Sequence, residues 1–150
     1  MKAEPRRTWH PPAREDARAW IKGKGRRLTP HREAVYEYLK GVRHHPTAEE
    51  IYVAVKQQIP RLSLATIYNA LELLVTVGLA SKITFGNAST RYDIRTDVHS
   101  HTRCLGCGRL EDVDVIPDQR WIGQIRVSGF RVADFRFELL GRCARCSSSA

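Results

Sequence analysis

Two matched pairs of cysteines constrain the fold of this 150-residue chain more than any other feature. Both pairs have the spacing Cys-x-x-Cys: Cys104 with Cys107, and Cys143 with Cys146, separated by 35 residues. Each pair can place two thiolates about 2.3 Å from one zinc ion, and two pairs complete a tetrahedron. The sequence therefore predicts one structural Zn²⁺ per subunit, with a closed coordination shell that leaves no position for a substrate.

Disulfide formation and thioredoxin-type redox chemistry are the alternative roles for these cysteines. Disulfides are typical of exported proteins, but residues 1–20 are rich in Arg, Pro and Glu and lack a hydrophobic stretch of the secretory type. No apolar run approaches the ~20 residues that a membrane helix needs. A thioredoxin-type site needs a single pair in a βαβ setting. We therefore expect a cytoplasmic protein with reduced thiols and no membrane partner.

Positive charge is concentrated in the first part of the chain. Residues 1–96 contain 17 basic and 9 acidic residues, whereas residues 97–150 contain 8 and 7. This imbalance indicates that the first part binds a polyanion such as nucleic acid. The alternative is a basic surface that only keeps the protein soluble.

Capping residues predict where helices begin in the basic part. Ala13 begins a short helix at 13–22, and Thr29 followed by Pro30 begins a second. Thr47 and Glu50 form a capping box that begins a third helix, which is expected to end at Pro60. Ser63 is expected to cap a fourth helix at 64–77, whose Ile67, Leu71 and Leu74 face a core.

The period of apolar residues changes after Gly78 from helical to alternating. A strand is predicted at 79–85, a turn at 86–87 and a return strand at 89–95. Three helices followed by a hairpin are typical of a winged helix-turn-helix, whose last helix enters the major groove of DNA. The alternative is an α+β core that happens to share this order.

The remainder of the chain has a different pattern. Strands are predicted at 109–115 and 129–140, with a helix at 118–127 between them. The apolar residues here are few for a domain of about fifty residues, so a metal, a partner chain or both should stabilise it. The predicted fold class is α+β: an N-terminal winged helix-turn-helix domain and a small C-terminal α/β domain with a zinc site of four cysteines.

Histidines and aspartates suggest a second metal site. His99 and His101 lie on one side of an extended segment, because their positions differ by two. Together with His45, Asp93 and Asp112 they offer three imidazoles and two carboxylates, which suit Fe²⁺, Mn²⁺ or Zn²⁺. These residues span the boundary between the two parts, so a shared ion would connect them. The alternative is that the histidines are ordinary solvated side chains.

Taken together, these motifs resemble the ferric uptake regulator family. The matching segments are 27–32, 45–52, 63–68, 86–93 and 99–101 together with both cysteine pairs. The resemblance runs from Ala13 to Cys146 and implies a homodimeric, metal-dependent transcriptional repressor. The predicted organisation is a winged-helix DNA-binding domain at 13–95, a hinge at 96–98, and a dimerisation and metal-binding domain at 99–150. The basic tail at 1–12 departs from the family pattern, as does Asn69, where many relatives carry Arg.

Within the family, the chain resembles the peroxide-sensing branch most. That branch binds its regulatory ion through three His and two Asp, and the matching residues are His45, Asp93, His99, His101 and Asp112. The resemblance implies one regulatory Fe²⁺ or Mn²⁺ per subunit, with Zn²⁺ as a substitute in vitro. It also implies that His45 and His99 are oxidised by H₂O₂ when Fe²⁺ is bound.

The partner implied by the resemblance is double-stranded DNA with a palindromic operator. Groove contacts are expected from Ser63, Ala65, Thr66, Tyr68 and Asn69, and phosphate contacts from Arg27, Arg32 and Lys82. The alternatives are an iron- or manganese-uptake repressor, an architectural DNA-binding protein, and a metallohydrolase that uses His99, His101 and Asp93. No HExxH motif or nucleophile elbow supports an enzyme, and no small organic substrate is expected.

Overall fold

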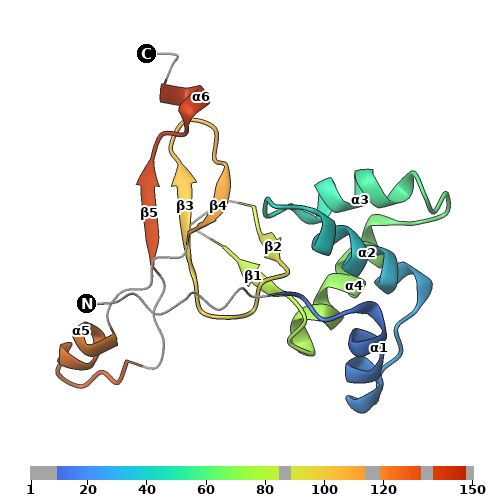
Figure 1. The fold of residues 1–150 in the computed structure, drawn as a ribbon, viewed down its shortest axis with the longest axis horizontal. Helices are drawn as coiled ribbons and strands as arrows, with labels where there is room; N and C mark the ends of the chain where they lie inside the picture. Colours follow the sequence, from blue (N-terminus) through green and yellow to red (C-terminus); the bar gives the residue numbers. More distant parts are fainter. Residues whose placement is uncertain (1–9, 85–88, 114–118, 133–136, 148–150) are drawn as a thin grey trace. The chain divides into compact units, whose positions relative to one another are not determined.

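The chain divides into two units, Met1–Asp97 and Val98–Ala150, in a computed structural model that describes residues 10–84, 89–113, 119–132 and 137–147 (Figure 1). The first unit contains α1 (Arg14–Gly23), α2 (Pro30–Gly41), α3 (Ala48–Lys56), α4 (Leu64–Thr76), β1 (Ser81–Ile83) and β2 (Arg91–Asp93). The second contains β3 (Ser100–Cys104), β4 (Leu110–Val113), α5 (Gln119–Gln124), β5 (Glu138–Gly141) and α6 (Ala144–Ser147). In the described ranges, no helix is both long and apolar enough to cross a membrane.

The helices of the first unit begin at the predicted caps. Thr29 accepts a hydrogen bond from the Arg32 N–H, and Pro30 is the first residue of α2. Both hydrogen bonds of the capping box join Thr47 and Glu50. The Ser63 hydroxyl accepts from the Thr66 N–H at 3.2 Å. Helix α3 ends at Lys56, one turn before the predicted end at Pro60.

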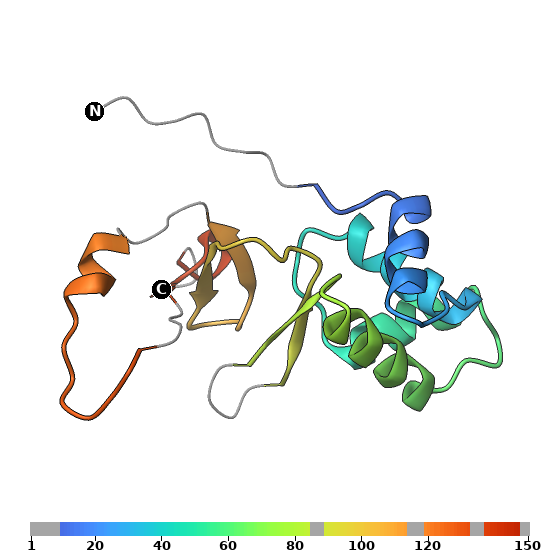
Figure 2. The same ribbon diagram turned by 90° about the horizontal axis from the view of Figure 1, so that it is seen from below.

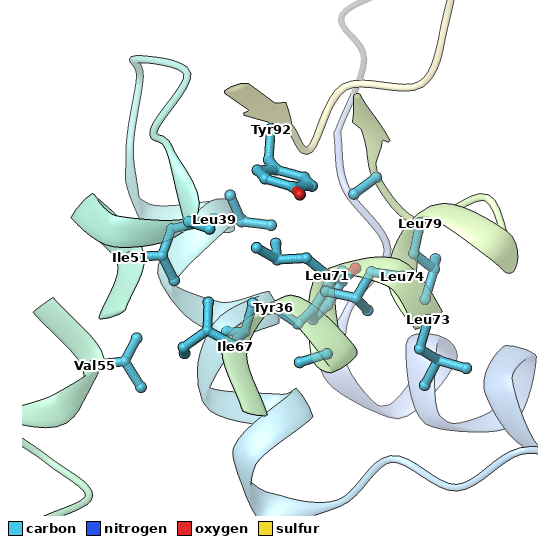
Figure 3. Packing of buried hydrophobic residues seen from close by; sticks show 14 of the residues in the cluster. Tyr36, Leu39, Ile51, Val55, Ile67, Leu71, Leu73, Leu74, Leu79 and Tyr92 are labelled. Carbon is cyan, nitrogen blue, oxygen red and sulfur yellow. The ribbon is translucent and has the colours of Figure 1, made fainter. Parts of the chain in front are cut away.

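A single hydrophobic core holds the first unit together (Figure 3). Ile67, Leu71 and Leu74 of α4 are fully buried, as predicted. Tyr36 of α2 is also fully buried. Its hydroxyl group has a hydrogen-bond partner despite the burial, because it donates to the Pro12 carbonyl at 2.7 Å. The core therefore fixes α2, α3 and α4 in one rigid group.

The β1–β2 hairpin completes the first unit beside α4 (Figure 2). Its strands are antiparallel, with Ser81 opposite Asp93 and Ile83 opposite Arg91. Both strands are shorter than the sequence predicts, and the predicted turn at 86–87 lies outside the described residues. Tyr92 packs on the core, and the next residue, Asp93, is also buried.

The second unit is built on a three-stranded sheet in the order β4-β3-β5. Strand β3 pairs antiparallel with β4 and parallel with β5. Within the predicted strand at 129–140, the described residues form β5 from Glu138 onward, whereas Val127 and Phe130 pair across a turn at Gly129, whose φ is +71°. Phe130 is 66% exposed in the single chain.

Candidate metal centres and nucleic-acid interface

Parallel pairing of β3 with β5 brings the two cysteine pairs together. Cys104 is the last residue of β3 and lies opposite Gly141, the last residue of β5. Because the strands run in the same direction, the segments that follow them lie at the same edge of the sheet. Cys107 lies in the turn after β3, and the second pair begins two residues after β5. All four Sγ atoms lie within 4.8 Å of one another.

The distances between sulfurs fit a tetrahedral zinc ion. With Zn–S bonds of about 2.3 Å, the edge of such a tetrahedron is about 3.8 Å. The Sγ atoms of Cys107 and Cys143 are 3.8 Å apart. The cysteines are free thiols rather than disulfides. The structure thus brings all four predicted zinc ligands together.

The thiols of this cluster differ in acidity. The Cys143 N–H donates to Cys104 Sγ at 3.2 Å, and this hydrogen bond is the main reason that the pKa of Cys104 falls to about 5. Hydrogen bonding to Cys143 raises the pKa of Cys146 to about 12. Crowded thiolates repel one another, and a divalent cation offsets that repulsion. The four converging sulfurs are therefore a suitable donor set for a divalent cation.

Gly106 packs closely against Cys146, and a substitution there tests how tightly the cysteine cluster fits together. A Cβ atom built there would lie 2.9 Å from both Cβ and Sγ of Cys146, which is closer than real contacts. Overpacking of this kind costs about 1–3 kcal/mol, so Gly106→Ala should release zinc to a chelator about tenfold faster. Gly141→Ala is the matched control, because no atom lies within 4 Å of its Cβ. Equal zinc release from the two variants would contradict the close fit.

Three of the five predicted regulatory ligands converge in the second unit. His101 of β3 lies directly opposite Asp112 of β4. The Nε2 atoms of His99 and His101 are 3.0 Å apart, and they lie 3.3 and 3.5 Å from Asp112 Oδ1. Two imidazole nitrogens and one carboxylate oxygen aimed at one point are a donor set for a first-row divalent ion. We call His99, His101 and Asp112 the second half-site.

The other two predicted ligands converge in the first unit. His45 Nε2 lies 3.4 Å from Asp93 Oδ2, and both side chains are at least 95% buried. The Arg95 N–H donates to Asp93 Oδ1 at 2.7 Å, which leaves Oδ2 directed at the imidazole. A buried carboxylate and imidazole with this geometry fit a pair of metal ligands. We call His45 and Asp93 the first half-site.

Arg91 and Glu50 hold the first half-site in place, a role that the sequence does not indicate for either residue. Arg91 Nη1 donates to the His45 carbonyl at 2.7 Å and lies 3.4 Å from Glu50 Oε2. The Tyr92 N–H donates to the Pro46 carbonyl at 2.9 Å. The segment with His45 is thus bonded to the strand with Asp93. A capping-box glutamate gives no sequence signal for this second contact, which spans 41 residues.

The predicted groove contacts all lie on or next to α4. Ser63 and Thr66 occupy its first turn, with their hydroxyl oxygens 2.8 Å apart. Ala65 and Asn69 are exposed. Tyr68 is 44% exposed, and its hydroxyl donates to Glu49 Oε1 at 2.7 Å. The face of α4 away from the core is therefore polar and accessible in the single chain.

The predicted phosphate contacts are exposed or half-buried cations. Arg27 is exposed, and its carbonyl accepts from Arg32 Nη1 at 2.7 Å. Lys82 of β1 lies 2.6 Å from Glu72 of α4. Glu49 and Glu72 have no recognisable signal in the sequence, because a carboxylate that pairs with a residue far along the chain leaves no local pattern.

Comparisons with known proteins agree with this architecture. The profile described as the ferric uptake regulator family matches residues 23–140. The chain is 38% identical over 135 residues to the peroxide operon regulator of Bacillus subtilis (strain 168), which covers 89% of this chain and 92% of that protein.

Solved structures resemble the chain over most of its length. The ferric uptake regulator Fur of Helicobacter pylori aligns with a TM-score of 0.73 and 24% identity, over 89% of this chain and 90% of that one. The peroxide stress regulator of Campylobacter jejuni aligns with a TM-score of 0.62 and 30% identity, over 79% and 90%. These likenesses confirm the predicted α+β fold class.

Proposed function

Since this chain belongs to the ferric uptake regulator family, we propose that it is a metal-dependent transcriptional repressor that senses peroxide. Members of the family are transcriptional regulators and not enzymes, and they bind DNA as dimers. The observation that carries the proposal is the convergence of His99, His101 and Asp112. This half-site contains nitrogen and oxygen donors only, because all four cysteines belong to the separate zinc cluster.

The two half-sites are proposed to bind one regulatory ion. Fe²⁺ and Mn²⁺ prefer more ligands than the two or three that each half-site offers alone. An ion bound by both would connect the DNA-binding domain (13–95) to the dimerisation and metal-binding domain (99–150). The boundary between the two units, after Asp97, falls in the predicted hinge at 96–98 and supports this arrangement.

The response to peroxide is proposed to occur at His45 and His99. Bound Fe²⁺ would activate H₂O₂ without being consumed overall, whereas Mn²⁺ reacts poorly with it. The imidazole would be the net two-electron reductant: its C–H would become C–OH, and the second oxygen of the peroxide would leave as water. His45 and His99 belong to different half-sites, so oxidation of either one weakens the connection between the domains. Repression then falls because the DNA-binding domain is released.

The DNA partner is proposed to be a palindromic operator. A dimer presents two copies of α4, and two-fold symmetry in the protein matches two half-sites in the duplex. Exposed apolar side chains such as Phe130 and Leu140 in the second unit support a dimer interface there. The basic tail at 1–12 adds sequence-independent attraction to phosphates. We expect the repressor to act in the cytoplasm, where thiols stay reduced.

The test compares operator binding by the zinc-loaded dimer with Fe²⁺, with Mn²⁺ and without added metal, before and after H₂O₂. We expect both ions to strengthen binding and peroxide to release only the iron form. Peptide mass spectrometry should then locate one added oxygen atom on His45 or His99. If the iron form resists peroxide as well as the manganese form does, the protein instead senses metal supply.

A further inference from the structure

A polar groove lies between α4 and the β1–β2 hairpin in the first unit. Its volume is about 520 Å³. The residues that line it are Glu49, Tyr68, Asn69, Glu72, Lys82, Ser89, Thr90 and Tyr92. We call this the α4 groove. It contains three of the residues expected to contact DNA, and it also contains two carboxylates. A negative charge on a DNA-binding face opposes phosphate attraction, so these carboxylates require an explanation.

Glu49 is fixed at one end of the α4 groove. It belongs to the first turn of α3, whose capping box holds the backbone rigid. The Tyr68 hydroxyl donates to its Oε1 at 2.7 Å, and this hydrogen bond is the main cause that lowers the pKa of Glu49. The carboxylate is therefore ionised at neutral pH. Its remaining lone pairs accept hydrogen bonds and cannot donate them.

Glu72 has a different position and a different partner. Its Oε2 lies 2.6 Å from Lys82 Nζ, and the two side chains are 63% and 41% exposed. Exposed pairs of this kind are weak and are screened by salt. The carboxylate nevertheless offsets the positive charge of Lys82, so a DNA phosphate is attracted to this ammonium group less than to an unpaired one. Glu72 thus acts on the phosphate contact alone.

On the basis of the proposed DNA-binding function, we propose that Glu49 is a specificity-determining residue of the α4 groove, whereas Glu72 limits sequence-independent phosphate binding through Lys82. An ionised carboxylate at a base edge accepts from the amino groups of cytosine and adenine. It is repelled by the acceptor atoms of guanine and thymine. Glu49 therefore excludes wrong sequences, and it also positions Tyr68 beside the same bases.

The competing explanation is that both carboxylates only hold the surface of the first unit together. Charge-neutral variants separate the two explanations. Glu49→Gln keeps a hydrogen-bond acceptor for Tyr68 but removes the negative charge. Glu72→Gln removes the charge beside Lys82. Glu37→Gln on α2 is the matched control, because Glu37 also forms an exposed pair with a lysine, Lys40, at 3.2 Å and lies outside the α4 groove.

The experiment uses the full-length dimer loaded with zinc and Mn²⁺. Wild-type protein first selects its preferred duplex from a random-sequence pool, and a scrambled duplex of the same composition serves as the unrelated DNA. Affinities of all variants for both duplexes are then measured over a range of salt concentrations. Wild-type protein that selects no sequence contradicts the proposed function itself, whereas the comparison among variants tests the roles of Glu49 and Glu72.

Glu72→Gln should change the affinity for any DNA, whereas Glu49→Gln should change the preference for the selected sequence. Glu72→Gln should strengthen binding to both duplexes by about three- to tenfold at ~0.1 M salt and steepen the salt dependence by about one phosphate contact. Glu49→Gln should lower the ratio of selected to scrambled affinity by about tenfold, because one correct base contact is worth about 1–3 kcal/mol. A ratio for Glu49→Gln equal to that of Glu37→Gln overturns the specificity role. An unchanged salt slope for Glu72→Gln overturns the masking of Lys82.

A double-mutant comparison tests whether Glu49 positions Tyr68. Glu49→Ala and Tyr68→Phe each remove the hydrogen bond, so the two changes should be non-additive in their effect on selected-duplex affinity. Thermal unfolding of each variant checks that the first unit stays folded. Full additivity of the two changes overturns the positioning role.

Discussion

Replacement of Cys143 by serine is expected to release the structural zinc and unfold the second unit. The variant keeps the size of the side chain but removes one of four converging sulfur ligands. Structural zinc sites contribute about 10–16 kcal/mol of apparent binding free energy in small domains. That amount is as large as the whole stability of a typical domain, about 5–15 kcal/mol. Loss of the ion should therefore be enough to unfold the second unit.

The second unit has little else to replace the zinc. Among the residues of this unit whose burial the structure describes (98–113, 120, 123–132 and 137–147), only Ser100, Cys104 and Leu110 are buried. One of the three is itself a zinc ligand. The first unit, by contrast, has a large apolar core of its own. We therefore expect the Cys143→Ser variant to lose the second unit and the dimer while the first unit stays folded.

Three measurements check this prediction. Zinc content should fall from one ion per subunit to substoichiometric levels, size-exclusion chromatography should show loss of the dimer, and circular dichroism should keep the helical signal of the first unit. Ala144→Ser is the control, because it introduces a serine between the same two cysteines at an exposed position. A Cys143→Ser dimer with full zinc content and an unchanged melting temperature would contradict the stabilising role of the site.

Features of the fold that depend on neighbouring residues could be predicted from the sequence. The capping box joins Thr47 and Glu50, which are three positions apart, and both of its hydrogen bonds are present. Hydrogen bonds of this kind form between residues that the chain already holds together, so they leave a local pattern. The Cys-x-x-Cys spacing is local in the same sense, and it predicted the four cysteines whose Sγ atoms converge.

Features that depend on long-range pairing could not be predicted in this way. Nothing near His101 in the sequence indicates that β3 pairs with both β4 and β5, or that β5 begins only at Glu138. The contact of Tyr68 with Glu49 joins residues 19 positions apart. Such contacts are set by the packing of whole elements, and each element alone has several compatible partners. The two carboxylates of the α4 groove were missed for this reason.

Replacement of His99 by alanine is expected to abolish the effect of metal on DNA binding without affecting the zinc site. His99 Nε2 lies within 3.3 Å of donor atoms of both His101 and Asp112, so its removal takes away the central donor of the second half-site. The zinc ligands begin at Cys104, on the far end of β3. A loss confined to the regulatory ion is therefore expected, with full zinc content and an intact dimer.

The size of this effect follows from the coupling between two binding sites. Coupling free energies are typically about 1–3 kcal/mol, so operator affinity in the presence of Mn²⁺ should fall by about one to two orders of magnitude, to the metal-free level. Reciprocity requires that the operator no longer strengthens Mn²⁺ binding by the variant. The metal-free affinity should stay unchanged, because the α4 groove is intact.

Fluorescence anisotropy with the selected duplex measures both affinities, and competition with a metal-binding dye measures the Mn²⁺ affinity with and without DNA. His44→Ala is the matched control, since His44 is exposed and belongs to neither half-site. An undiminished Mn²⁺ response in His99→Ala would mean that the second half-site does not hold the regulatory ion. If His44→Ala also loses the effect of Mn²⁺ on operator affinity, the loss in His99→Ala is not specific to the half-sites. The half-sites would then not explain the effect of the metal.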